Sequence, residues 1–254
     1  MSELVYGIHT VESIVNQSPN RILIVYIVSN PRDLRLKSLI YRIRKMNINI
    51  QECTRRVLNI KSMKSAHQGI IAEVIPMPAL NEDYLLHFLK TKNNIIPLLL
   101  VLDGITDPHN LGACIRSADA AGVHMIIVPR DRSANVNATV RKVASGSSDR
   151  VPFVRVTNLS RTLKLLKKYN IYIVGSVLRS NQILFNTRLI DPIALVMGSE
   201  SSGIRRLTRE NCDKLVHIPT LQSTVSLNVS VATGIFLFET VRQRKYQNGF
   251  INYS

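Results

Sequence analysis

A loop and helix near the middle of the chain combine residue types suited to binding a phosphate backbone. Arg116 follows Gly112 by four residues, and a helical side chain leans back over the position four residues before it. Because Gly112 has no side chain, an RNA backbone could approach there and be reached by the Arg116 guanidinium. The alternative is an ordinary solvated arginine on a surface helix. Asp107-Pro108 suits an N-cap followed by proline in the first turn, so this sequence predicts where the helix begins.

Two glycines and one acid define a second candidate loop, at residues 197–203. Gly198 and Gly203 allow a tight turn with exposed backbone N–H groups, and Glu200 adds a carboxylate. Neither this loop nor the Gly112 segment reads Gly-x-Gly-x-x-Gly, and no Gly-Lys-Ser or Gly-Lys-Thr sequence occurs. The sequence therefore lacks the dinucleotide-binding and phosphate-loop signatures.

A third stretch, residues 218–239, begins with a polar loop and continues as a long apolar run that ends in charge. Ser226 and Asn228 precede the apolar run. Side-chain oxygens of these residue types accept hydrogen bonds from the free N–H groups of a first helical turn. Helix capping explains both residues without any further function, and the whole stretch predicts strand, loop and helix.

Charge and composition narrow the class of protein. The 254 residues include 33 Lys and Arg against 17 Asp and Glu, a formal net charge of +16 that is scattered along the chain. This favours a folded protein with a polyanionic partner, most simply a nucleic acid, over a basic protein with no such partner. Cys53, Cys114 and Cys212 lack metal-type spacing, which indicates no metal and a reducing, cytoplasmic setting. No apolar run approaches membrane-spanning length, so we expect no membrane partner.

Apolar periodicity divides the chain into two α/β parts. Residues 1–75 predict a small domain with a helix over 34–46, whose basic face could follow phosphates or simply be solvated. Residues 76–96 predict a linker with one short helical pattern. Residues 97–254 alternate apolar strands with helices, which predicts a mostly parallel sheet with helices on both faces. The strands are expected at 98–102, 123–128, 153–156, 171–177, 194–197 and 215–218.

The three loops together resemble the signature motifs of the SpoU (TrmH) branch of the SPOUT RNA 2'-O-methyltransferases. All three follow predicted strands, and ligands of parallel α/β sheets bind beyond the carboxyl ends of strands. The similarity extends over nearly the whole chain and is greatest to the member that methylates a guanosine ribose in the peptidyl-transferase region of 23S rRNA. The matching residues are Asn110, Gly112, Arg116, Ala118 and Gly122 in the first loop, Gly198, Glu200 and Gly203 in the second, and residues 226–232 in the third.

The resemblance implies an S-adenosylmethionine site in a trefoil knot within residues 97–254, a homodimer, and an L30e-like RNA substrate-binding domain at residues 1–75. Nothing in the periodicity shows a knot, and knots are rare among proteins. The cofactor would contact Gly198, Ile218 and Leu227, with Val177 and Ser176 bordering its pocket. The catalytic set would be Asn110, Arg116, Glu200, Ser226 and Asn228.

The chemistry of methyl transfer agrees with these residue types. A ribose 2'-hydroxyl must attack the methyl carbon of a sulfonium in line, so the protein must align two reactants and help the hydroxyl lose its proton, without a metal. A guanidinium is always protonated, so we expect Arg116 to position an RNA phosphate and polarise the hydroxyl. Asn110 and Asn228 would orient groups through hydrogen bonds. Glu200 would hold Arg116 or the loop. Ser226 would support Asn228.

One position departs from the family motif. Gln222 stands where the family usually has Gly, and Thr220 replaces the usual Met. Gln adopts a positive φ poorly, so this change could weaken cofactor binding.

Two other functions stay open. One is a tRNA guanosine 2'-O-methyltransferase, against which the separate N-terminal domain argues. The other is a non-catalytic RNA-binding ribosome-assembly factor that has kept the fold, for which Gln222 would be the reason. An α/β protein acting on a small metabolite is disfavoured by the charge.

Overall fold

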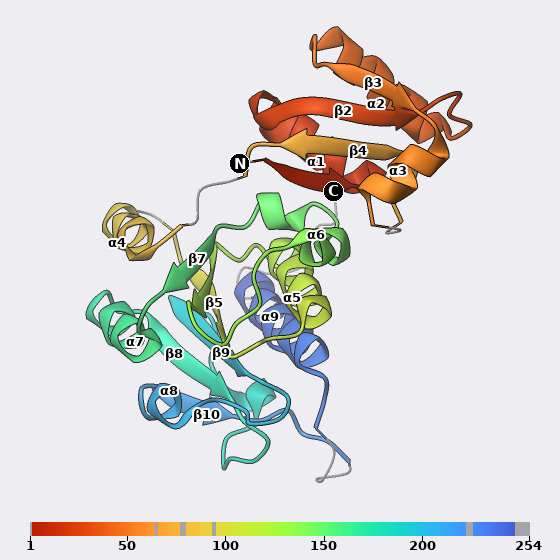
Figure 1. Ribbon diagram of the computed structural model, residues 1–254. Coiled ribbons are helices and arrows are strands. Elements are labelled where there is room, and N and C mark those ends of the chain that lie inside the picture. Colours follow the sequence, from red (N-terminus) through yellow and green to blue (C-terminus); the bar gives the residue numbers. More distant parts are fainter. Residues whose placement is uncertain (1, 64–65, 77–79, 93–94, 222–225, 247–254) are drawn as a thin grey trace. The chain divides into compact units, whose positions relative to one another are not determined.

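The computed structural model describes residues 2–63, 66–76, 80–92, 95–221 and 226–246. Gln222 and parts of the predicted linker therefore lie outside the described residues. The chain forms two compact units, one of Met1–Pro78 with Val136–Arg150 and the other of Ala79–Asn135 with Val151–Ser254. Figure 1 shows the elements of each unit. Among the described helices, none has the length and apolar character needed to cross a lipid bilayer.

The first unit is built on a four-stranded sheet in the order β1-β4-β2-β3. The β1–β4 and β4–β2 pairs are antiparallel, and the β2–β3 pair is parallel. Helices α1 and α2 cover one face with a large apolar core, and α3 packs on the other face against a smaller cluster. The elements from this part of the chain are β1 (Glu3–Tyr6), α1 (Ile8–Gln17), the 3-10 turn η1 (Pro19–Arg21), β2 (Ile22–Val28), α2 (Leu34–Lys45), β3 (Ile50–Cys53), α3 (Arg55–Lys61) and β4 (Ile70–Val74).

Local sequence accounts for most of these elements. The Asp33 carboxylate caps α2 by accepting a hydrogen bond from Leu36 N at 3.0 Å, and four apolar residues of that helix are buried. The predicted helix and strand over 22–46 are thus found. Strand β1 was not predicted, because its four residues carry too short a pattern to identify.

The first unit also contains a segment from the middle of the chain. Residues 136–150 form α6 (Ala138–Ala144) and the 3-10 turn η2 (Ser147–Asp149). Arg141 pairs with Asp149 at 2.8 Å and with Glu3 at 3.0 Å, and Arg21 lies 3.5 Å from Asp149. Only 1% of the Asp149 side chain is exposed. Residues 97–254 are therefore not one compact unit, because ion pairs and packing hold this segment against the N-terminal strands and helices.

The second unit contains a six-stranded parallel sheet in the order β10-β8-β9-β5-β6-β7. All six strands confirm the sequence prediction, with ends that differ by at most a few residues. They are β5 (Leu98–Asp103), β6 (Met125–Pro129), β7 (Phe153–Val156), β8 (Tyr172–Ser176), β9 (Ile193–Gly198) and β10 (Lys214–Val216). The central strands β5, β6 and β9 are buried along nearly their whole length, as apolar strands covered on both faces must be.

Helices cover both faces of this sheet. Figure 1 shows α4, α7 and α8 on one side and α5 and α9 on the other. The apolar residues Leu85 and Leu89 of α4 belong to the core of this unit, so the predicted linker contains a helix that packs with the second unit. The helices are α4 (Glu82–Thr91), α5 (Pro108–Ala120), α7 (Leu159–Lys168), α8 (Arg206–Glu210) and α9 (Val229–Tyr246), with a 3-10 turn η3 (Leu184–Asn186).

Candidate active site

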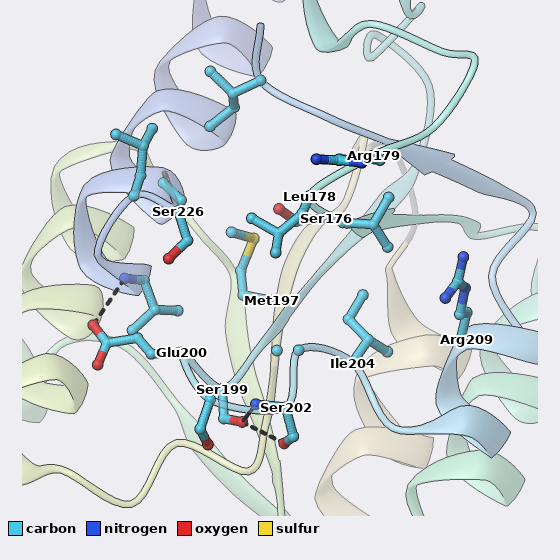
Figure 2. A pocket seen from close by; sticks show the side chains of 18 of the residues that line it. Ser176, Leu178, Arg179, Met197, Ser199, Glu200, Ser202, Ile204, Arg209 and Ser226 are labelled. Atoms are coloured by element: carbon cyan, nitrogen blue, oxygen red, sulfur yellow. Dashed lines mark hydrogen bonds between the residues drawn. The ribbon is translucent and has the colours of Figure 1, made fainter. Parts of the chain in front are cut away.

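A cavity of about 700 Å³ lies beyond the carboxyl ends of β8, β9 and β10 in the second unit. Because these strands are parallel neighbours, their last residues and the loops that follow meet at one edge of the sheet. Figure 2 shows the side chains that surround the cavity. All five residues predicted to bind the cofactor line it: Ser176, Val177, Gly198, Ile218 and Leu227.

Gly198 ends β9 at a point where no other residue fits. The following loop folds back so that Ser199 N and Gly203 N each bond the other residue's carbonyl, at 3.2 and 2.8 Å. A Cβ atom at position 198 would lie 2.1 Å from the Gly203 carbonyl carbon and 2.2 Å from Ile204 N. Gly203 has φ +64°, which a glycine adopts without strain. The tight turn predicted from the two glycines is therefore found, and it forms one wall of the cavity.

Three of the predicted catalytic residues form a hydrogen-bonded cluster at the edge of the cavity. Asn110 Nδ2 donates to Glu200 Oε1 at 3.2 Å, and Asn228 Nδ2 donates to Asn110 Oδ1 at 3.0 Å and also to Glu200 Oε1. Glu200 Oε1 further accepts from Val229 N at 3.3 Å, at the N-terminus of α9, where a carboxylate is stabilised. The cluster joins Asn110, in the first turn of α5, to two residues that lie 90 and 118 positions later in the sequence.

Asn228 also caps α9, as its sequence position predicts. Its Oδ1 accepts hydrogen bonds from Ser230 N at 3.0 Å and from Ser230 Oγ at 2.6 Å. One side chain thus orders the start of the helix through its oxygen and joins the cluster through its nitrogen.

The other two predicted catalytic residues, Arg116 and Ser226, make no hydrogen bond to this cluster among the described residues. Arg116 is exposed on α5, and its guanidinium has no hydrogen bond or ion pair within the described ranges. Ser226 lines the cavity, and no hydrogen bond to Asn228 is present among the described residues. Glu200 bonds Asn110, Asn228 and Val229 N, and among the described residues it makes no bond to Arg116.

Gly112 corrects one expectation about the first loop. It is buried, because it belongs to the face of α5 that includes Leu111, Cys114 and Ile115. Its missing side chain therefore does not open the helix surface to RNA, although Arg116 one turn later remains accessible. Asp107 caps this helix by accepting from His109 N at 3.0 Å, and Pro108 follows it as predicted.

The two cysteines of this unit are poor nucleophiles. Burial raises the pKa of the Cys114 thiol to about 11 and that of the Cys212 thiol to about 12. Cys114 also donates toward Thr233 Oγ1 at 3.5 Å on α9. The described residues contain no group of three or more His, Cys, Asp or Glu placed to hold a metal ion. The reactive groups around the cavity are therefore amides, hydroxyls, one carboxylate and arginines.

Sequence reasoning missed three charged residues near the cavity. Asp103, buried at the end of β5, accepts from Arg205 Nε at 2.6 Å and from Arg205 N at 3.0 Å. This pair fixes the chain that leaves the Gly198–Gly203 loop. Arg179 and Arg209 line the cavity itself. An acid directly after a buried strand is the signal that could have identified Asp103, whereas nothing in the spacing distinguishes the two cavity arginines from others.

Comparison with known proteins gives the same assignment for both parts of the chain. Residues 97–238 match the SpoU rRNA Methylase family, and residues 4–79 match the RNA 2'-O ribose methyltransferase substrate binding family. The chain is 52% identical to the 23S rRNA (guanosine-2'-O-)-methyltransferase RlmB of Photorhabdus laumondii, covering 96% of this chain and 99% of that protein. It is 50% identical to RlmB of Escherichia coli K12, covering 96% of this chain and all of that protein.

A solved structure extends the comparison to the fold. The SpoU methyltransferase AviRb from Streptomyces viridochromogenes, crystallised in complex with the cofactor AdoMet, superposes with a TM-score of 0.79 at 25% identity, covering 96% of this chain and 91% of that one. The family match spans more than half of this chain, and the relatives match it almost from end to end. The chain belongs to the SpoU rRNA methylase family.

Proposed function

We propose that this protein transfers a methyl group from S-adenosylmethionine to the ribose 2'-hydroxyl of a guanosine in the peptidyl-transferase region of 23S rRNA. The observation that carries the proposal is the placement of the Asn110–Glu200–Asn228 cluster at the edge of the cavity that the five predicted cofactor residues line. Two relatives support the substrate. Both are named 23S rRNA (guanosine-2'-O-)-methyltransferase RlmB, and they share 52% and 50% identity with this chain over nearly their whole length.

The cavity suits the cofactor in size and lining. Its volume of about 700 Å³ lies within the range of roughly 300–1,000 Å³ that small-molecule sites occupy. The turn at Gly198 leaves no side chain between the cofactor and the backbone of the loop. Val177, Met197 and Ile204 supply apolar surface around it. When bound, S-adenosylmethionine supplies an electrophilic methyl group on a sulfonium.

The cluster would orient the acceptor ribose. Asn110 and Asn228 are held by Glu200 Oε1, and this restricts the directions in which their amides can bond the RNA. Preorganised hydrogen-bonding groups lower the barrier because they need not rearrange during reaction. Arg116, exposed and unpaired within the described ranges, would bind the adjacent phosphate and polarise the 2'-hydroxyl while staying protonated. Ser226 would contact the reactants from the cavity wall.

The first unit would bind the RNA substrate as an L30e-like domain. Its match to a substrate-binding family supports this role. On α2, Arg35, Lys37 and Lys45 are exposed, and the Lys45 ammonium lies 4.9 Å from the centre of the exposed Tyr41 ring. A basic surface that also carries an aromatic side chain suits a phosphate backbone and an unstacked base.

A homodimer, a trefoil knot and a cytoplasmic location complete the proposal. Helix α9 carries two large apolar side chains on its exposed face, Val231 and Phe238, which are 51% and 49% exposed. They are seven residues apart and so lie on the same side of the helix, where a second copy would cover them. The knot is what the family resemblance implies for residues 97–254.

Mapping the methylated nucleotide tests this function. The protein would be incubated with labelled S-adenosylmethionine and unmodified 23S rRNA, and 2'-O-methyl sites would be located by primer extension at low nucleotide concentration. We expect one labelled guanosine in the peptidyl-transferase region. Unmodified tRNA under the same conditions should stay unlabelled; label in tRNA alone, or in neither RNA, would contradict the proposal.

A further inference from the structure

Two arginines line the cofactor cavity and take no part in the chemistry described above. Arg179 lies in the loop after β8, and Arg209 lies in α8. Both are exposed, and both border the same cavity. Figure 2 shows them on the side of the cavity away from Glu200 and Ser226.

Neither guanidinium has a protein partner in the described part of the chain, since no hydrogen bond or ion pair involves either one. The neighbouring arginines differ in this respect. Arg205 is bound to the buried Asp103, and Arg206 pairs with Glu210 at 2.9 Å. Two unpaired cations that face one cavity attract an anion, and a guanidinium binds a carboxylate through parallel N–H donors.

The charges around the cavity are arranged in a way that matches the cofactor. The Glu200 carboxylate stands at one side, and the two guanidinium groups stand at the other. S-adenosylmethionine carries a positive sulfonium and, at the end of its amino-acid chain, a carboxylate. A molecule with this charge separation gains most when its sulfonium faces the acid and its carboxylate faces the arginines.

Resting on the function proposed above, we propose that Arg179 and Arg209 form a carboxylate subsite that binds the amino-acid end of S-adenosylmethionine. They are positioning residues: by holding the carboxylate they direct the sulfonium toward Glu200, Asn110 and Asn228. The demethylated product keeps the same carboxylate, so the subsite binds cofactor and product alike and raises the affinity for both.

Calorimetry with two ligands tests the subsite. S-adenosylmethionine and its decarboxylated analogue differ only by the carboxylate, so the ratio of their dissociation constants isolates its contribution. Wild-type protein should bind S-adenosylmethionine about tenfold more tightly than the analogue, the size of effect of one charge-assisted hydrogen-bonded pair. R179A and R209A should each reduce this preference, and the double variant should lower it to about one.

Two controls keep the result interpretable. The affinity of the double variant for the decarboxylated analogue should stay within about twofold of wild type, which shows that the cavity has kept its fold. R206A, on the same helix but paired with Glu210 and absent from the cavity lining, should keep the wild-type preference.

Three outcomes overturn the subsite. The first is an equal affinity of the wild type for both ligands. The second is a double variant that still prefers S-adenosylmethionine as strongly as the wild type does. The third is a double variant that keeps this preference but binds rRNA more weakly and with a smaller salt dependence, which would assign the arginines to RNA phosphates. A wild-type protein that binds neither ligand would instead contradict the proposed function.

Discussion

The two compact units hold distant pieces of chain together by different means. In the second unit, local features shape the functional loops: the turn at Gly198 closes through its own backbone bonds, and Asn228 caps α9. Side-chain bonds, including the pair of Asp103 with Arg205, then join these loops to distant segments. In the first unit, residues 136–150 are held by ion pairs, with the Asp149 side chain 1% exposed between Arg21 and Arg141. A glycine turn and an N-cap leave a local signature in the sequence, whereas an ion pair between distant segments leaves none.

Removing the buried acid should have the largest effect. Asp149→Ala leaves the largely buried guanidinium groups of Arg21 and Arg141 with Glu3 as their remaining acid, so we expect the first unit to lose about 3 kcal/mol of stability. Hydrogen exchange of amides in β1 and α6 measures the stability lost in the first unit separately from that of the second. The matched control is Asp191→Ala, whose pair with Arg188 is exposed and should contribute less than about 1 kcal/mol. Equal losses in both variants would show that the ion pairs do not hold this segment.

A single methyl group at Gly198 tests the backbone side of the comparison. Gly198→Ala places a Cβ within 2.4 Å of three backbone atoms, so the loop must shift, at a cost of about 1–3 kcal/mol. We expect S-adenosylmethionine affinity to fall by about tenfold or more, measured by calorimetry. In Gly234→Ala the nearest atom to the added Cβ is Ser117 Oγ at 4.0 Å, so that variant should bind normally. Normal binding by the Gly198 variant would remove the turn from the cofactor site.

Replacing the Glu200 carboxylate by an amide of nearly the same size weakens the hydrogen bonds of the cluster and leaves no cavity. Glu200→Gln keeps an oxygen but loses the charge that binds Asn110, Asn228 and Val229 N. We expect single-turnover methyl transfer to slow by about ten- to a hundredfold, because misplaced orienting groups cost rate. Cofactor affinity should fall by no more than about fivefold, because the lost charge faces the sulfonium but is exposed to solvent. Glu210→Gln, which alters only the exposed pair with Arg206, should leave both values unchanged.

The smallest expected effect is that of thiol alkylation. The raised pKa values of Cys114 and Cys212, about 11 and 12, favour the protonated thiol, so the reactive thiolate becomes abundant only as the pH approaches those values. Iodoacetamide at pH 7.5 should therefore leave methyl transfer unchanged. Rapid inactivation that is prevented by S-adenosylmethionine would mean that one of these thiols is accessible from the cavity.

These differences explain what could be predicted from the sequence. The parallel sheet and its strands were predictable because apolar strands, glycine turns and N-caps are local features. The five cavity residues were predicted from the family resemblance and not from local features. The place of residues 136–150 was not, because Arg141 and Asp149 look like ordinary surface charges until Glu3 and Arg21 lie beside them. The packing of α4 was likewise hidden, since its apolar face is only a few residues long. The family resemblance, and not the spacing, supplied the roles of Arg116 and the cluster.

The most direct test is the Arg116→Ala variant in single-turnover methyl transfer to 23S rRNA, with cofactor affinity measured in parallel. Arg116 is exposed on α5 and does not line the cavity, so its loss should leave S-adenosylmethionine binding within about twofold of wild type. We predict that transfer falls by at least about a hundredfold, since the charge that positions the phosphate and polarises the hydroxyl is gone. Near-normal transfer by this variant would contradict the mechanism.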